Sequence, residues 1–389
     1  MQSTKIEWAT HSSNPIMAFN IHTNKRGHYC TKVSRGCSNC YAERINLEWG
    51  NKLEYTAQNA KNIRFELNHD ELKKIRDFKK PARVFLCDMT DFAHDLIPDT
   101  MIIKLIATLI QARPWVHSLL LTKRIQRIAK LFTDPKFIQA IFTEIYGELP
   151  PATTQELFGT PSSQTVIRLG LDSQSPGAMF QWPPQNIHIG TSIEDQKTLW
   201  QRGHYLAHLT RAGWTTYYSL EPMIGPVDYE NVKLPPVGPE VTTLDLPRAP
   251  YFTNYLRGTD DTPLVHGIIL GGESGQGAVP LHPELPRTIR DTCIKHRIPY
   301  FFKQWGHWLP VENTKTPAWQ HGGPPRDWPW NEIDPRIEKD PTEPWRYFAL
   351  GKTQTGNTLD QRQHLYIPNR DCKNITQQEW LQTAKEHAA

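Results

Sequence analysis

Short apolar runs alternate with amphipathic stretches along most of this sequence, and polar clusters separate them. The apolar runs occupy residues 82–86, 117–121, 186–189, 215–218, 267–270 and 299–302. Helical periodicity follows several of them, over residues 101–110, 195–209 and 283–296. This alternation predicts parallel strands joined by crossover helices. We expect one further strand, the first of the sheet, within residues 14–22.

Each expected strand ends in polar residues that are suited to chemistry. The run at 82–86, for example, is followed by Cys87-Asp88-Met89-Thr90-Asp91. In a (β/α) barrel the carboxyl ends of the strands meet on one face, and the site is built there. We therefore predict an α/β protein with a partial, TIM-like (β/α) barrel. An open doubly wound sheet is the alternative, and it would place its site at a single crevice.

The 389 residues are enough for one large domain with insertions or for two modest domains. We assign residues 1–308 to the barrel. Two regions that break the pattern, at about 133–185 and 227–266, are expected to be insertions. Residues 309–389 are dense in proline and tryptophan and end in a helical stretch, which predicts a C-terminal extension.

Composition favours a cytoplasmic protein. No stretch approaches the roughly 20 apolar residues of a membrane-spanning helix, and residues 1–10 lack the apolar core of a secretory signal. The 44 basic and 40 acidic residues give a net charge of +4. This balance is compatible with a nucleic-acid partner but does not predict one.

Three of the six cysteines, Cys30, Cys37 and Cys40, fall within eleven residues. Thiolates are soft ligands that select zinc or iron–sulfur clusters. A four-iron cluster held by these three thiolates would keep one iron open for a substrate or a cofactor. The simplest alternative is a set of three thiols that bind nothing.

Two further readings require a fourth ligand. A structural zinc site takes four ligands, and the fourth would be His11, His22, His28 or a distant cysteine. A conventional electron-transfer cluster takes four cysteines, and the fourth would be Cys87, Cys293 or Cys372.

The segment from Cys30 to Glu43, Cys-Thr-Lys-Val-Ser-Arg-Gly-Cys-Ser-Asn-Cys-Tyr-Ala-Glu, resembles the signature of the phage three-Cys-motif protein family. That family is regarded as part of, or close to, the radical S-adenosylmethionine (radical SAM) superfamily. Further blocks resemble those of the family in the same order, at residues 88–91, 121–124, 190–195, 219–222 with 225–226, 271–275 and 301–306. The resemblance covers residues 1 to about 308.

The resemblance implies a partial barrel of the radical SAM type with a [4Fe–4S] cluster on Cys30, Cys37 and Cys40. SAM would chelate the open iron through its amino and carboxylate groups. Reduction would cleave SAM to methionine and a 5′-deoxyadenosyl radical, which takes hydrogen from a substrate. The first gap between the cysteines is six residues here, where three are commonest in the superfamily.

Cofactor ligands are expected at the strand ends. Asp88 and Thr90 follow the second strand, which is the place of the group that holds the SAM amino nitrogen. The Gly-Gly-Glu at residues 271–273 follows a later strand, so this role is not transferred to it. Lys123 and Arg124 are candidates for the SAM carboxylate or a substrate phosphate. Alternatively, they face solvent at the start of a helix.

Three more residues are candidates on the next strands. Thr191 and Ser192 are expected to bind the ribose or the amino-acid part of SAM, or to cap the following helix. Glu221 is expected to accept bonds from ribose hydroxyls or to transfer a proton. Alternatively, it pairs with Lys123 or Lys303. Glu221 and Lys123 are the catalytic candidates.

The last strands supply the remaining candidates. Glu273 and Lys303 are expected to contact substrate or cofactor. Trp305 is expected to stack on adenine or a nucleobase, and the alternative is a core position. His94 and Asp95, shortly after the second strand, are further candidates at the face where the strands end.

The leading hypothesis is therefore an iron–sulfur radical SAM-type enzyme. A nucleotide or nucleic-acid substrate is expected from the phage associations of the family, and from the resemblance of Thr122-Lys123 to the spore photoproduct lyase-like branch. One alternative is a nucleic-acid or protein-binding module whose cysteines hold a structural zinc or cluster. Another is an iron–sulfur redox or sensor protein that never cleaves SAM. A partner protein is compatible with each of these hypotheses.

Overall fold

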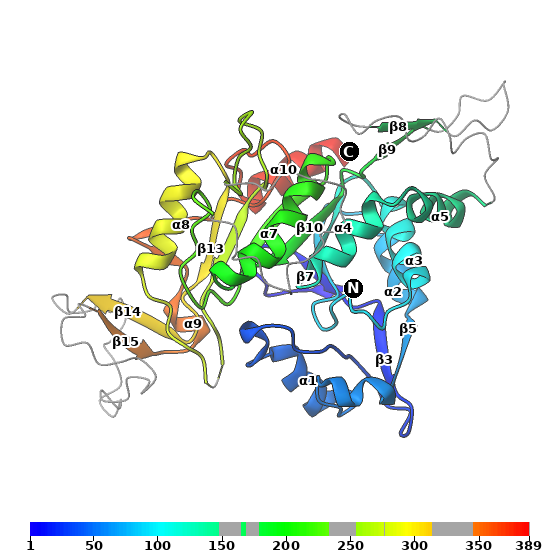
Figure 1. The fold of residues 1–389 in the computed structure, drawn as a ribbon, viewed down its shortest axis with the longest axis horizontal. Coiled ribbons are helices and arrows are strands. Elements are labelled where there is room, and N and C mark those ends of the chain that lie inside the picture. Colours follow the sequence, from blue (N-terminus) through cyan, green and yellow to red (C-terminus); the bar gives the residue numbers. More distant parts are fainter. Residues whose placement is uncertain (148–164, 169–178, 233–253, 276, 313–344, 389) are drawn as a thin grey trace.

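A computed structural model describes residues 1–147, 165–168, 179–232, 254–275, 277–312 and 345–388. The chain is a mixed α/β protein built on one curled, eight-stranded sheet (Figure 1). The strands lie in the order β1 (Gln2–Ser3), β2 (His11–Ser13), β6 (Ala82–Leu86), β7 (Val116–Thr122), β10 (Ile187–Ser192), β11 (Thr215–Leu220), β12 (Ile268–Gly271) and β13 (Tyr300–Gln304). All but β1 run parallel.

The sheet forms half of a barrel, because β1 and β13 are its two edges among the described strands. The six apolar runs of the sequence are confirmed as the parallel strands β6, β7, β10, β11, β12 and β13. Strands that are buried on both faces read as continuous apolar runs, so they are easy to find.

The prediction of the first strand is wrong. Residues 14–22 contain β3 (Ile16–Asn20), but this strand pairs with β4 (Arg26–Gly27) and β5 (Ile63–Leu67) in a separate antiparallel sheet. The first parallel strand is β2, which pairs with β6. Its three residues, His-Ser-Ser, are too few and too polar to give an apolar run.

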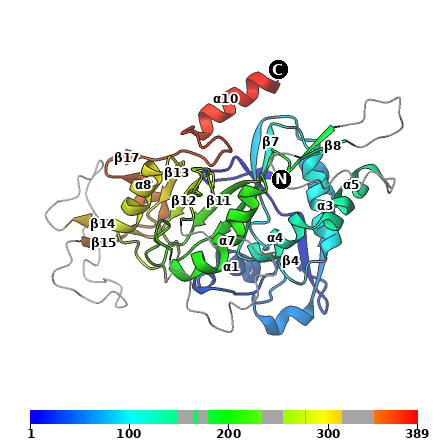
Figure 2. The same cartoon turned by 45° about the horizontal axis from the view of Figure 1, so that its top comes forward.

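Helices cover the convex face of the sheet (Figures 1 and 2). They are α2 (His69–Arg76), α3 (Asp99–Ile110), α4 (Ile125–Thr133), α5 (Pro135–Tyr146), α7 (Gln196–Arg211) and α8 (Glu284–Lys295). Apolar residues of α3 at spacings of three and four are buried, and Asp195 and Thr198 form a capping box at the start of α7. No helix among these described residues is both long and apolar enough to span a membrane.

Several small elements complete the chain. They are the 3₁₀ helices η1 (Arg35–Cys37) and η2 (Ala57–Asn62), the helices α1 (Tyr41–Trp49), α9 (Lys352–Thr355) and α10 (Gln377–Ala388), and the strand pairs β8 (Thr165–Arg168) with β9 (Met179–Trp182), β14 (Trp308–Glu312) with β15 (Trp345–Ala349), and β16 (Thr358–Leu359) with β17 (Arg362–Gln363). Parts of both expected insertions and of the extension, at 148–164, 169–178, 233–253 and 313–344, lie outside the described residues.

The concave face of the sheet has its own apolar cluster. Side chains from five strands form it, namely Phe85, Leu119, Tyr217, Ile269 and Phe301. Trp8 joins the cluster, and the C-terminal segment packs against it through Leu365, Ile367, Ile375 and Trp380. We call the amino ends of the strands, where Trp380 lies, the closed end of the half-barrel. The carboxyl ends of the strands, at the opposite end of the half-barrel, are where a site can form.

Gly190 makes room for this concave cluster. A Cβ atom at residue 190 would lie 2.3 Å from the ring of Tyr217, which is fully buried. We therefore expect Gly190→Ala to lower the free energy of unfolding in urea by about 1–3 kcal/mol through overpacking. Gly225→Ala is the control, because a Cβ there meets only the Cβ of Asp195, at 3.5 Å. Equal losses in both variants would contradict this account.

Two histidines at the closed end should make stability depend on pH. His117 Nδ1 lies 3.0 Å from His188 Nε2, and Trp380 packs on His117. Burial, assisted by the charge of Arg83, lowers the pKa of His117 to about 3. The unfolded chain binds a proton below about pH 6.5, and the folded chain does not. Stability should therefore fall with decreasing pH, by at most about 1.4 kcal/mol per pH unit for each such histidine.

Urea denaturation between about pH 7 and pH 4 tests this dependence. His117→Gln removes one group that titrates on unfolding, so its stability should fall less steeply than that of the wild type. Parallel curves for the two proteins would contradict the assignment, whatever the difference in stability at neutral pH.

Candidate functional site

A cavity of about 590 Å³ opens at the carboxyl ends of the parallel strands. Six strand ends contribute side chains to it, among them Asp88, Lys123, Ser192, Glu221, Glu273 and Lys303. The loop before α1 supplies Cys30, Cys37 and Cys40. Strand geometry thus brings together residues that are far apart in the sequence. We call this cavity the pocket, and residues 30–40 the cysteine loop.

The three cysteines of the loop are free thiols, and each is partly exposed. Cys87, which is also free, lines the same pocket, but it is buried. Cys293 and Cys372 are not among the lining residues. Within the described ranges, no three histidine, cysteine, aspartate or glutamate side chains are gathered so as to hold a metal ion.

The thiols differ in how readily they ionise. Burial would raise the pKa of Cys37, but the charge of Lys123 and hydrogen bonds from the loop outweigh burial and lower it. Burial, reinforced by Asp91, raises the pKa of Cys30 to about 11. Burial also raises the pKa of Cys40. Cys37 is therefore the most readily formed thiolate of the three, and thiolates are the metal-binding form of cysteine.

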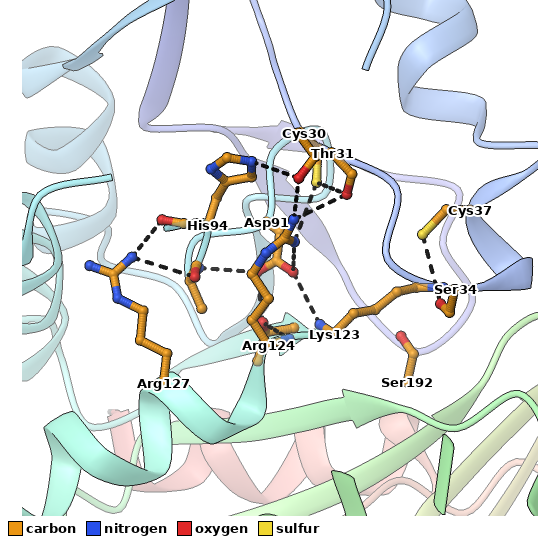
Figure 3. A network of polar contacts seen from close by, with 12 residues as sticks. Cys30, Thr31, Ser34, Cys37, Asp91, His94, Lys123, Arg124, Arg127 and Ser192 are labelled. Carbon is orange, nitrogen blue, oxygen red and sulfur yellow. Dashed lines mark hydrogen bonds and ion pairs between the residues drawn. The ribbon is translucent and has the colours of Figure 1, made fainter. Parts of the chain in front are cut away.

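Arg124 fixes the first part of the cysteine loop (Figure 3). Its Nη1 donates to Asp91 Oδ2 at 2.9 Å, and its Nη2 donates to the carbonyl and the hydroxyl of Thr31 at 3.0 and 2.7 Å. The same guanidinium lies 3.6 Å from Cys30 Sγ. Asp91 also accepts from the hydroxyl of Thr122 at 2.6 Å. The end of β7 thus holds Cys30 next to a positive charge.

His94 extends this network and Asp95 does not. His94 Nε2 lies 3.0 Å from Thr31 Oγ1, and Arg127 donates to the carbonyl of His94. Burial, then the charge of Arg124, lowers the pKa of His94 to about 4, so the ring is neutral at physiological pH. Asp95 is exposed and does not line the pocket.

Glu194 fixes the middle of the loop, and sequence analysis missed it. Its carboxylate accepts from Ser34 Oγ at 2.6 Å and from the Gly36 backbone N–H at 2.8 Å. It also pairs with Lys123 and lies 3.6 Å from Arg202. A Cβ at residue 36 would lie 2.6 Å from the Glu194 carboxyl carbon, so this close approach requires glycine.

The charge state of Glu194 follows from these contacts. Burial alone would raise the pKa of this carboxyl, but Lys123 and the hydrogen bonds from the loop lower it. Lys123 therefore stands between a carboxylate and the thiol of Cys37. Lys123 lines the pocket, where a ligand role was predicted, and it does not take the solvent-facing position that was the alternative. Its pairing with Glu194 makes it a positioning residue for the loop.

Glu273 holds the last part of the loop, and Asp88 holds Tyr41, the first residue of α1. Asn39 Nδ2 donates to Glu273 Oε1 at 2.9 Å, and the N–H of Val279 donates to the other oxygen at 2.7 Å. The hydroxyl of Tyr41 donates to the carbonyl of Asp88 at 2.8 Å. Burial raises the pKa of Asp88, although it accepts hydrogen bonds and lines the pocket.

Glu221 and Lys303 form an ion pair in the wall of the pocket. Lys303 Nζ lies 2.5 Å from Glu221 Oε1, and Ser219 Oγ donates to Oε2 at 3.2 Å. This is the pairing that the sequence left open as an alternative to a ligand role. Both side chains keep part of their surface open to the pocket, so the pair also presents a carboxylate and an ammonium group to a ligand.

The model of one protein family matches residues 3–368, and the description of that family is "Protein of unknown function (DUF5131)". The chain belongs to this family. No curated protein and no solved structure matches the chain. The family description states no activity, so the chemistry is inferred from the residues that line the pocket.

Three predicted site residues of this DUF5131 chain, Thr90, Thr191 and Trp305, are buried. Thr90 lines the pocket but is buried, and its hydroxyl accepts from the N–H of Tyr29 at 3.4 Å. Thr191 does not line the pocket, because alternation along β10 turns it to the convex face, where it donates to the carbonyl of Thr122 at 2.8 Å. Its neighbour Ser192 does line the pocket.

Trp305 also lies outside the pocket. Its Nε1 donates to the carbonyl of Thr358 at 3.0 Å, and its ring packs on Phe302 with a centroid distance of 4.9 Å. A register shift in the pairing of β12 with β13 places Gln304 beside Gly271 at the end of the strand. Gln304 and Lys303 face the pocket instead. The core position, which was the alternative for Trp305, is the one that this structure has.

Proposed function

We propose that the pocket binds a [4Fe–4S] cluster through Cys30, Cys37 and Cys40, together with SAM, and that the protein is a radical SAM-type enzyme acting on a nucleotide or nucleic acid. The observation that carries the proposal is the anchoring of the cysteine loop. Polar contacts from the ends of β7, β10 and β12 hold this one short loop at the pocket, and a contact from the end of β6 holds Tyr41, the residue that follows it.

The donor set suits the cluster. Three free thiols share one pocket, and two cations stand beside them, Lys123 near Cys37 and Arg124 near Cys30. Positive charge next to a thiol favours the thiolate that binds iron. When bound and reduced, such a cluster supplies the electron that cleaves SAM to methionine and a 5′-deoxyadenosyl radical.

The chain's own residues would bind and orient SAM. Asp88 offers a carboxylate to the amino group of SAM, and Glu221 offers one to the ribose hydroxyls. Lys303, held by Glu221, presents an ammonium group to an anionic part of SAM or substrate. Ile6, Trp8, Phe85 and Leu121 give the pocket an apolar floor, which limits the access of water to reactive species.

The role of Asp88 can be tested by SAM binding. We expect Asp88→Asn to weaken binding of SAM to the reconstituted protein by about tenfold or more, because a hydrogen bond to a charged group is lost. Equilibrium dialysis with labelled SAM measures the dissociation constant. Asp95→Asn is the control, since this carboxylate is exposed outside the pocket. Unchanged binding by Asp88→Asn would contradict its assignment.

A second candidate function is that of an iron–sulfur redox or sensor protein without SAM chemistry. Cys87 favours it, because this fourth thiol lines the same pocket. Cys87 is buried, however, whereas Cys30, Cys37 and Cys40 are each partly exposed, and this difference favours the three-cysteine proposal.

A further inference from the structure

Helix α1 carries an apolar stripe that faces solvent. Tyr41, Ile45 and Trp49 are 46%, 40% and 79% exposed. They are four residues apart, so they share one side of the helix. Ala42 and Asn46 occupy the other side and are buried. In Figure 1 the helix lies at the lower edge of the molecule, away from the helices that cover the sheet. Contiguous exposed apolar side chains of this kind mark interaction sites.

The stripe begins at the mouth of the pocket. Tyr41 is both the first residue of α1 and a lining residue of the pocket. Cys40 is the N-cap of the same helix. A ligand lying along α1 would therefore reach the cysteine loop and the pocket.

The charge around the stripe is strongly positive. Residues 22–52 contain six basic side chains, Lys25, Arg26, Lys32, Arg35, Arg44 and Lys52, and two acidic ones, Glu43 and Glu48. The resulting +4 equals the formal net charge of the whole chain. All six basic residues are exposed. Lys32 is paired with Glu43 at 2.8 Å, and Lys52 bonds to the carbonyl of Glu48.

We infer that α1 and the cysteine loop bind a single strand of nucleic acid. The bases stack on Trp49 and Tyr41, and Arg35 and Arg44 contact phosphates. Exposed aromatic side chains beside cations are the usual means of binding unpaired bases. A base must also leave its stack before it can enter a pocket of this kind. The inference deepens the proposed function, on which it rests for the claim that this strand carries the substrate.

A protein partner is the rival occupant of the stripe. Interface cores between proteins are depleted of lysine, although arginine is enriched there. The segment around the stripe instead has three lysines among its six basic residues. Polyanionic nucleic acid complements this charge, so the observations favour nucleic acid.

Fluorescence anisotropy with a labelled oligonucleotide of about 12 nucleotides tests the inference. The full-length protein should bind the single strand more tightly than the corresponding duplex. Trp49→Ala should weaken binding by about 5- to 100-fold through the loss of stacking, and Trp49→Phe should restore most of the affinity. Ile294→Ala, at an apolar side chain on α8 that is 66% exposed, is the matched control and should bind as the wild type does.

The salt dependence tests the phosphate contacts separately. Each phosphate contact to a single strand adds about 0.7 to the slope of log affinity against log salt. The double variant Arg35→Ala with Arg44→Ala should therefore have a slope smaller by about 1.4. Thermal unfolding of each variant establishes that it is folded before its binding is compared.

Three results would overturn the inference. They are no binding of the single strand at about 50 mM salt, equal affinities of Trp49→Ala and Ile294→Ala, and a dimer in solution that Trp49→Ala dissociates. The proposed function and this inference can fail independently. If the protein binds the oligonucleotide but its cluster signal does not change with SAM, only the radical SAM activity is contradicted. If the cluster signal changes with SAM but no oligonucleotide binds, only the binding of nucleic acid along α1 is contradicted.

Discussion

Replacing Glu194 by glutamine is expected to lower the free energy of unfolding by about 3–5 kcal/mol, because two cations lose their buried counterion. Glu194 is almost fully buried, and it pairs with Lys123 and lies 3.6 Å from Arg202. Glutamine has nearly the same shape and keeps an oxygen that can accept from Gly36. The decrease in the free energy of unfolding therefore reports on the lost charge. Urea denaturation measures this decrease.

A double-mutant cycle separates the ion pair from other effects of the substitution. Lys123→Met removes the cation and keeps the apolar stem, so Glu194→Gln should cost less in that background. We expect a coupling energy of about 1–3 kcal/mol for residues in direct contact. Glu48→Gln is the control, since this glutamate is exposed on α1. Additive losses in the cycle would contradict a direct interaction between Glu194 and Lys123.

Replacing any one cysteine of the loop by serine is expected to abolish the cluster. Each of Cys30, Cys37 and Cys40 is needed if three thiolates bind three irons. The iron content after anaerobic reconstitution should fall from about four atoms per chain to background. Cys372→Ser is the control, because this thiol is outside the pocket. It should retain full iron content.

Cys87→Ser distinguishes the enzyme from the redox protein. A three-cysteine cluster does not need Cys87, so we expect wild-type iron content and an unchanged visible spectrum. A four-cysteine cluster would lose iron in this variant as it does in the other three. That result would contradict the open coordination site on which SAM binding depends.

The fold was largely predictable, because its parallel strands are buried on both faces. The run at residues 82–86 matches β6 residue for residue. The polar β2 escaped detection, since its parallel pairing with β6 is decided by tertiary structure. The barrel was also expected to start at residues 14–22, where β3 forms a different sheet.

The candidate site was predictable in its strand ends but less so in its side chains. Clustered cysteines and polar residues after strands indicated which residues would meet, and Asp88, Ser192 and Glu221 line the pocket. Glu194 was missed because its loop partners Ser34 and Gly36 are 160 and 158 residues away in the sequence. A glutamate directly after a strand end and before a helix cap was the available signal.

Electron paramagnetic resonance of the anaerobically reconstituted and reduced protein, with and without SAM, tests whether the three cysteines hold a cluster that binds SAM. We expect a reduced [4Fe–4S] signal that changes when SAM is added, followed by the appearance of 5′-deoxyadenosine. A tightly bound zinc without a cluster, or a cluster signal that SAM leaves unchanged, would rule out radical SAM chemistry in this pocket.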